Sequence, residues 1–304
     1  MSLPIKLQLP TGFLDEEVRC GFTVTEKLKK IWAVELDLLA ELLRVCKKHE
    51  IPIQVFGGTL LGTIRHHGFI PWDDDLDVAL TRDGFEKLRQ VADSEFKYPY
   101  FFQTALSDQK YFFAFGRLRN SETTAAVSGS DTPDYNNGIY IDVYVLEGYP
   151  PTRWLTRLQD FMIMCAVKPL TMYFRDKPKN KTLQERLMRL TRPVFKLLKY
   201  ETLVCCHQRV LGFFTPFVSR VGLRDELSVQ ARRYWMYKDE LRETEEAQFE
   251  MLKVPVTKFW DDVLKRLYGD YMRFPSASER GKWHEGMIRF DPDTSYKVSL
   301  DMKE

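Results

Sequence analysis

The segment VFGGTLLGTIRHHGFIPWDDDLDVAL, residues 55–80, decides how the rest of the sequence is interpreted. Its start is apolar and strand-like, and it is closed by Gly57 and Gly58. The residues after the glycines suit a short helix through His66, which Thr59 is expected to cap. The acidic middle has the composition of a turn, and the last residues resume the alternation of a strand. We therefore predict two strands that flank a glycine turn and a helix.

The glycine turn lies where the predicted helix begins. Backbone N–H groups at a helix start lack intrahelical partners and carry partial positive charge, so Gly57 and Gly58 are predicted to bind phosphate oxygens. Two common phosphate loops are disfavoured, because Gly62 is followed by Thr63 rather than Lys and because adjacent glycines do not fit GxGxxG. A turn that only reverses the chain is the alternative interpretation.

Acidic residues follow the helix in the run Asp73-Asp74-Asp75-Leu76-Asp77. Residues two apart on a strand face the same side, so Asp75 and Asp77 can direct their carboxylates at one hard cation. We favour a catalytic metal site over a solvated loop. A third carboxylate, Asp142, lies in the apolar run GIYIDVYVL, where a charge needs a partner or a metal. Three converging carboxylates would suit two metal ions about 4 Å apart, an arrangement used in phosphoryl transfer.

The chain is expected to be an α/β (α+β) protein in two parts. The first half combines both patterns, with helices expected at residues 25–50 and 83–92 and strands at 100–103, 111–118 and 138–146. The second half is helical in pattern over residues 154–174, 183–214 and 227–252. We place a boundary near Tyr149. Residues 1–149 are predicted to form the catalytic core with an N-terminal helix, and residues 150–304 a mainly helical portion that completes the cleft and the acceptor side.

Composition narrows the class of protein. The 304 residues are 44% hydrophobic, and 45 Lys and Arg against 43 Asp and Glu leave a net charge of +2, which does not indicate a nucleic-acid binder. We expect no signal peptide, no membrane span and no disulfide or zinc framework, and hence a cytoplasmic protein. Residues 168–200 carry ten basic residues against two acidic ones. That stretch predicts contact with an anionic acceptor or the cytoplasmic membrane face, or else a solvated basic surface.

Three motifs resemble those of the LicD family. GGTLLGTIRHHGFIPWDDDLD is similar to the family's approximate pattern GxLLGxxRHxGFIPWDDDxD, and IDVYVLEG is similar to its IDIFPLD segment. The C-terminal YGDYMRFPSASERGKWH is similar to its YGDYM…P…R…H ending. The resemblance spans residues 26–284, and Tyr144-Val145 departs from it where the family has Phe-Pro.

The resemblance implies a fold and an activity. LicD proteins, like fukutin and fukutin-related protein, are phosphotransferases of nucleotidyltransferase-like fold with a mixed sheet. They move phosphocholine or a polyol phosphate from a CDP-activated donor to a glycan and release CMP. The implied partners are CDP-choline or another CDP-alcohol, and a lipopolysaccharide, teichoic acid or lipid-linked saccharide. A true nucleotidyltransferase that attacks the α-phosphorus, and an inactive glycan-binding protein, are the alternatives.

The resemblance also implies roles for individual residues. Asp75 and Asp77 would hold Mg²⁺ or Mn²⁺, Asp142 would be the third carboxylate, and Gly57-Gly58 would be the phosphate turn. Arg65 is expected to donate to the diphosphate. The further candidates for substrate binding are Thr59, His66, Arg117, Arg119 and His284. For Arg117 and Arg119, which alternate on a strand with Leu118 inward, a solvent-facing position is the alternative.

Overall fold

A mixed β-sheet holds the end of the segment 55–80 at its centre. The computed structural model describes residues 3–127, 135–174, 193, 197–224, 234–276, 278–280 and 288–301. Strand β4 (Asp77–Thr81) pairs antiparallel with β3 (Gln54–Val55) and parallel with β8 (Ile139–Gly148). Both faces of β4 are covered, because Val78, Ala79 and Leu80 are fully buried. The predicted α/β class is confirmed.

The long strand β8 connects the rest of this sheet. Its other edge pairs with β6 (Gly116–Asn120), which in turn pairs with β5 (Tyr100–Gln103). Its end pairs with β9 (Arg220–Gly222), and β10 (Trp235–Tyr237) follows. Strands from the second half of the chain thus extend the sheet of the first half. The domain boundary near Tyr149 stays a prediction.

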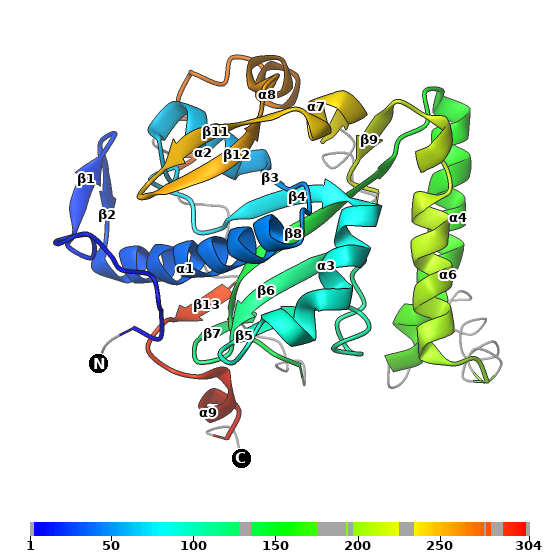
Figure 1. Ribbon diagram of the computed structural model, residues 1–304, viewed down its shortest axis with the longest axis horizontal. Coiled ribbons are helices and arrows are strands. Elements are labelled where there is room, and N and C mark those ends of the chain that lie inside the picture. Colours follow the sequence, from blue (N-terminus) through cyan, green and yellow to red (C-terminus); the bar gives the residue numbers. More distant parts are fainter. Residues whose placement is uncertain are drawn as a thin grey trace.

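Helix α1 (Glu26–Lys48) lies along the sheet and is anchored to the acidic segment (Figure 1). Its start is capped by Thr25, whose Oγ1 accepts a hydrogen bond from the N–H of Leu28 at 3.3 Å. Apolar residues at three- and four-residue spacing fill the core from this helix. The indole of Trp32 donates from Nε1 to the carbonyl oxygen of Asp73 at 2.9 Å. The helix therefore fixes the loop that carries the aspartates.

The remaining elements surround this centre. They are β1 (Glu17–Arg19), β2 (Phe22–Val24), α2 (Gly57–His66), α3 (Arg82–Glu95), β7 (Thr124–Val127), α4 (Arg153–Phe174), α6 (Tyr200–Gly212), a 3-10 turn (Thr215–Phe217), α7 (Lys238–Arg242), β11 (Thr244–Phe249), β12 (Leu252–Thr257), α8 (Trp260–Tyr268), β13 (Ile288–Asp291) and α9 (Tyr296–Asp301). Figure 1 shows α4 and α6 side by side at one end of the molecule, opposite the β1–β2 hairpin. No helix in the described ranges is long and apolar enough to cross a membrane.

One helix prediction is wrong. The sequence pattern favours a helix over residues 227–252, but the described part of that range holds β10, the short α7 and strand β11, which pairs with β12 along its whole length. Glu, Ala and Gln in β11 have good helix propensity, yet pairing with β12 and burial of Phe249 decide its conformation. Residues 183–192 and 194–196 of the predicted helix 183–214 lie outside the described residues, and its described end contains α6.

Candidate functional site

Helix α2 begins at the glycine turn and faces the aspartates. Gly57 has φ +55°, a left-handed conformation that favours glycine, and a Cβ there would lie 3.3 Å from Oδ2 of Asp77. The helix start has no side-chain cap. The expectation that Thr59 caps α2 is wrong, because its Oγ1 instead accepts from the backbone N–H of Asp77 at 2.8 Å. Thr59 thus ties the glycine helix to the first residue of β4.

The structure brings Asp75 and Asp77 to one cavity wall, together with Asp73. Asp77 is the first residue of β4, whereas Asp75 precedes the strand, so strand alternation is not what aligns them. Gly58 lies next to this wall, since a Cβ there would lie 3.1 Å from Oδ2 of Asp73. The fold therefore places the start of α2, at Gly57 and Gly58, close to these carboxylates.

Crowding of negative charge perturbs the carboxyl groups. The pKa of Asp77 is raised well above its usual range, by burial first and then by the charges of Asp75, Asp142 and Asp73. Burial and the charge of Asp75 raise the pKa of Asp73 in the same way. Oδ1 of Asp77 is buried and has no hydrogen-bond partner among the described residues. An orphaned carboxylate oxygen within a cluster of aspartates fits a bound divalent cation.

Asp142 faces the same side of the sheet as Asp77. The two residues are register partners on the parallel strands β4 and β8, and Asp142 is also the register partner of Arg117 on β6. Nε of Arg117 donates to Oδ1 of Asp142 at 2.7 Å, and the hydroxyl of Tyr144 donates to Oδ2 at 3.5 Å. Arg117 thus occupies this carboxylate. Within the described residues, no three His, Cys, Asp or Glu side chains form a ready metal-binding group.

The cavity beside the aspartates has a volume of about 560 Å³. Its polar wall is completed by Gly58, Arg65, Asp270, Arg273, Ser276 and Glu279. Its aromatic wall is formed by Trp72, Tyr234, Tyr268, Tyr271 and Phe274. Two of these tyrosines and Asp270 belong to the YGDYM motif, residues 268–272, at the end of α8. The cavity therefore joins the central and C-terminal motifs in one site.

Arg65 and His66 lie at the far end of α2. Nη1 of Arg65 donates to the carbonyl oxygen of Tyr271 at 2.6 Å, and its Nε donates to Nε2 of His66 at 2.9 Å. The ring of His66 stacks on Phe274 with centroids 5.5 Å apart. Burial, together with the charge of Arg65, lowers the pKa of His66 to about 4. Arg65 lines the cavity and also fixes the C-terminal loop, whereas neutral His66 supports Phe274.

Of the predicted site residues, Gly58, Arg65, Asp75 and Asp77 line the cavity, whereas Gly57, Thr59, His66, Arg117, Arg119 and Asp142 are not among its described lining residues. Arg119 is 1% exposed, donates to Oε1 of Gln103 and to the carbonyl oxygen of Gly138, both at 2.6 Å, and does not line the cavity. Neither Arg117 nor Arg119 faces solvent as the alternating pattern allows, because aromatic rings cover this face of β6. The ring centroid of Tyr140 lies 3.9 Å from the guanidinium of Arg117 and 4.7 Å from that of Arg119. His284 lies outside the described residues.

Glu35 is a buried carboxyl group that the sequence analysis missed. It lies on α1, one turn after Trp32, and is 1% exposed. Burial, followed by the charges of Asp75, Asp74, Asp73 and Asp77, raises its pKa well above the usual range. The sequence signal that could have identified Glu35 is its position on the core-facing stripe of α1. Glu35 adds a further acidic group behind the aspartate wall.

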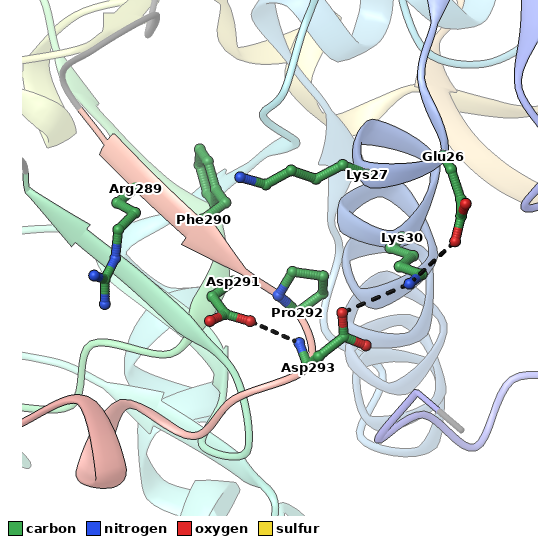
Figure 2. A pocket seen from close by; sticks show the side chains of 8 residues that line it. All are labelled: Glu26, Lys27, Lys30, Arg289, Phe290, Asp291, Pro292 and Asp293. Carbon is green, nitrogen blue, oxygen red and sulfur yellow. Dashed lines mark hydrogen bonds and ion pairs between the residues drawn. The ribbon is translucent and has the colours of Figure 1, made fainter. Parts of the chain in front are cut away.

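A second cavity, of about 450 Å³, lies between the start of α1 and β13. Figure 2 shows the ion pairs of Lys30 with Glu26 and Asp293 across it, and the contact between the backbone N–H of Asp293 and Asp291. Its three basic and three acidic lining residues balance in charge. None of the predicted site residues that the structure describes lines this cavity.

The fold and site define a mixed α/β protein whose glycine helix start faces an aspartate-lined, aromatic-walled cavity. Comparison with protein families matches residues 50–172 to the family described as LicD/FKTN/FKRP, nucleotidyltransferase domain. Residues 50–172 therefore match the LicD family, and the resemblance seen in the motifs is confirmed.

Individual relatives agree with this assignment. The lipopolysaccharide cholinephosphotransferase LicD of Haemophilus influenzae is 23% identical over 267 residues, which cover 84% of this chain and 96% of that protein. An uncharacterised protein of Rickettsia prowazekii is 37% identical over 55 residues, 18% of this chain and 21% of that protein. The similarity to the Haemophilus protein extends well beyond the matched domain.

Proposed function

We propose that this protein transfers phosphocholine, or a related alcohol phosphate, from a CDP-activated donor to a glycan hydroxyl and releases CMP. The observation that carries the proposal is the cavity, in which three aspartates, a glycine helix start and an aromatic wall meet. The extended similarity to a cholinephosphotransferase supports the same reaction class.

Asp75 and Asp77 are the residues proposed to hold a magnesium or manganese ion. The carboxylate oxygens are ligands that such hard cations prefer. Burial first, and then the neighbouring negative charges, raise the pKa of Asp77, and a cation would offset both effects. When bound, the cation neutralises charge on the diphosphate of the donor. The fold brings Asp142 to the same side of the sheet, and Asp142 stays a candidate third ligand.

The protein's own groups position the donor on both sides of the reacting phosphorus. The start of α2 offers backbone N–H groups to phosphate oxygens at Gly57 and Gly58. A choline group has no N–H and is held through aromatic faces, which the aromatic wall offers. That wall already accommodates cations, because the guanidinium of Arg280 lies 4.7 Å from the ring centroid of Trp72. Asp270 and Glu279 add negative charge beside it.

The proposed reaction is an in-line displacement at the phosphorus distal to cytidine. The glycan oxygen forms a bond to that phosphorus, the bond from phosphorus to the CMP oxygen breaks, and CMP leaves. Asp142 is proposed to accept the hydroxyl proton, and Arg117 orients it through the 2.7 Å contact.

The test is incubation of the purified protein with Mg²⁺ and a panel of CDP-choline, CDP-ethanolamine, CDP-glycerol and CDP-ribitol. We expect CMP release, fastest from CDP-choline, with phosphocholine as the second product, because water replaces the glycan hydroxyl as acceptor. Absence of CMP from every donor would refute the proposal. Formation of pyrophosphate from CTP and an alcohol phosphate would instead identify a true nucleotidyltransferase.

A further inference from the structure

Helix α4 presents an outward face on which apolar and basic side chains alternate. Its exposed residues share an arc of about 140° of the helix surface, because they recur at three- and four-residue spacing. They are Arg153, Trp154, Arg157, Leu158, Phe161, Met164 and Cys165. Trp154 is 65% exposed and Phe161 59%. A concentration of large apolar side chains on one exposed face marks an interaction surface.

This face is basic as well as apolar. The one acidic residue in the sequence of α4 is Asp160, which is already paired with the buried Arg224. Arg153 and Arg157 form no ion pair with any described residue. With Arg220 they line a cavity of about 400 Å³ at the start of α4, and no Asp or Glu is among the lining residues. The surface therefore suits an anionic partner.

Further exposed aromatic residues follow at the end of α6. Phe213 is 53% exposed and Phe217 77%. This end lies beside the first turns of α4, because Nε2 of Gln159 donates to the carbonyl oxygen of Leu211 at 3.2 Å. Figure 1 shows the α4–α6 pair at one end of the molecule. Trp, Phe and Leu beside Arg on one face are typical of helices that lie in a membrane interface.

We propose that the outward face of α4, with Phe213 and Phe217, docks on the surface of an anionic lipid bilayer. The apolar side chains enter the headgroup region, and Arg153, Arg157 and Arg220 contact lipid phosphates. Docking goes beyond the proposed chemistry, since it would bring the cavity to a lipid-linked acceptor.

The test is co-sedimentation of the full chain with vesicles of phosphatidylcholine, with and without phosphatidylglycerol, at low and high salt. We expect binding only to the anionic vesicles, and weaker binding at high salt. Each basic residue near an anionic bilayer contributes about 1 kcal/mol, so Arg153→Gln and Arg157→Gln should each lower the partition coefficient about fivefold. Trp154→Ser with Phe161→Ser should lower it as well.

Matched control variants remove the same kinds of side chain, basic and apolar, from other parts of the surface. Lys87→Gln with Lys253→Gln removes two exposed charges, and Val18→Ser removes an apolar side chain that is 70% exposed. These variants should bind vesicles like wild type. The proposal fails if wild type ignores anionic vesicles at low salt, or if the α4 variants bind as tightly as wild type. It also fails if wild type self-associates without lipid and Trp154→Ser with Phe161→Ser abolishes that association.

CMP release from a water-soluble donor separates this proposal from the proposed function. All α4 variants should release CMP at the wild-type rate, because none of the changed residues lines the aspartate cavity. Loss of vesicle binding with normal CMP release supports the docking surface. Vesicle binding that depends on α4, in a protein that releases no CMP, supports docking and refutes the proposed function.

Discussion

Replacement of Gly57 by alanine tests whether the glycine turn serves the site or only the chain reversal. The left-handed φ of +55° costs an alanine about 1–2 kcal/mol. The added methyl group would also lie 3.3 Å from Oδ2 of Asp77, so that carboxylate must move by a few tenths of an ångström. A misplacement of 1 Å near the chemistry costs about 100-fold in rate, so we expect a loss of about tenfold in turnover from this smaller shift.

Gly21→Ala is the matched control, because Gly21 has φ +72° and no atom lies within 4 Å of its Cβ position. Both variants should lose about 1–2 kcal/mol of unfolding free energy, measured by chemical denaturation. Only Gly57→Ala should show slower CMP release and a higher Mg²⁺ requirement. If the two variants have equal activity and equal Mg²⁺ dependence, the glycine turn has no role in the site.

Three other outcomes follow from the structure. The folded-state pKa values of Asp77 and Glu35 lie above the ordinary values of 3.8 and 4.5, so their ionisation opposes folding at neutral pH. This cost disappears as the pH falls towards those ordinary values. The Tm of the metal-free protein should therefore fall as the pH rises above about 5. Mg²⁺ should raise the Tm more at pH 8 than at pH 5, and calorimetric scans in which Mg²⁺ raises the Tm equally at both pH values would contradict this. Asp142→Ala should stop transfer while calorimetry still detects CDP-choline binding, and wild-type turnover would remove Asp142 from the site. Arg119→Met should cost about 3 kcal/mol in denaturation, because Gln103 and Gly138 lose their buried donor, but should leave turnover per folded molecule unchanged.

The central part of the fold could be predicted because its signals are local. Apolar spacing in residues 25–50 gives α1, and the glycine pair followed by acidic residues gives α2 and β4. The juxtaposition of Asp77 and Asp142 could not be predicted from local sequence patterns alone. It depends on the parallel register of β4 and β8, whose strands are separated by more than fifty residues in the chain.

Other features of the site depend on tertiary contacts that a single sequence does not specify. Arg117 and Arg119 have the spacing of a solvent-facing pair, but the ring of Tyr140 covers both guanidinium groups, and Asp142 and Gln103 accept their hydrogen bonds. The aromatic wall joins Trp72 to Tyr234 and Phe274, which only the folded chain brings together. Glu35 lies on the core-facing stripe of α1 in the sequence, but only the fold shows that the charges of the aspartates act on it.

The most direct measurement of the account is CMP release from CDP-choline by wild type, Asp75→Asn and Asp77→Asn, in Mg²⁺ and in EDTA. The exposed Asp93, changed to Asn, is the matched control. Loss of the charge proposed to hold the cation should lower turnover at least about 100-fold in both site variants, with unchanged circular dichroism, while Asp93→Asn keeps wild-type turnover. EDTA should abolish wild-type activity, and Mg²⁺ or Mn²⁺ should restore it. Full turnover by Asp77→Asn, or by wild type in EDTA, would contradict the proposed site.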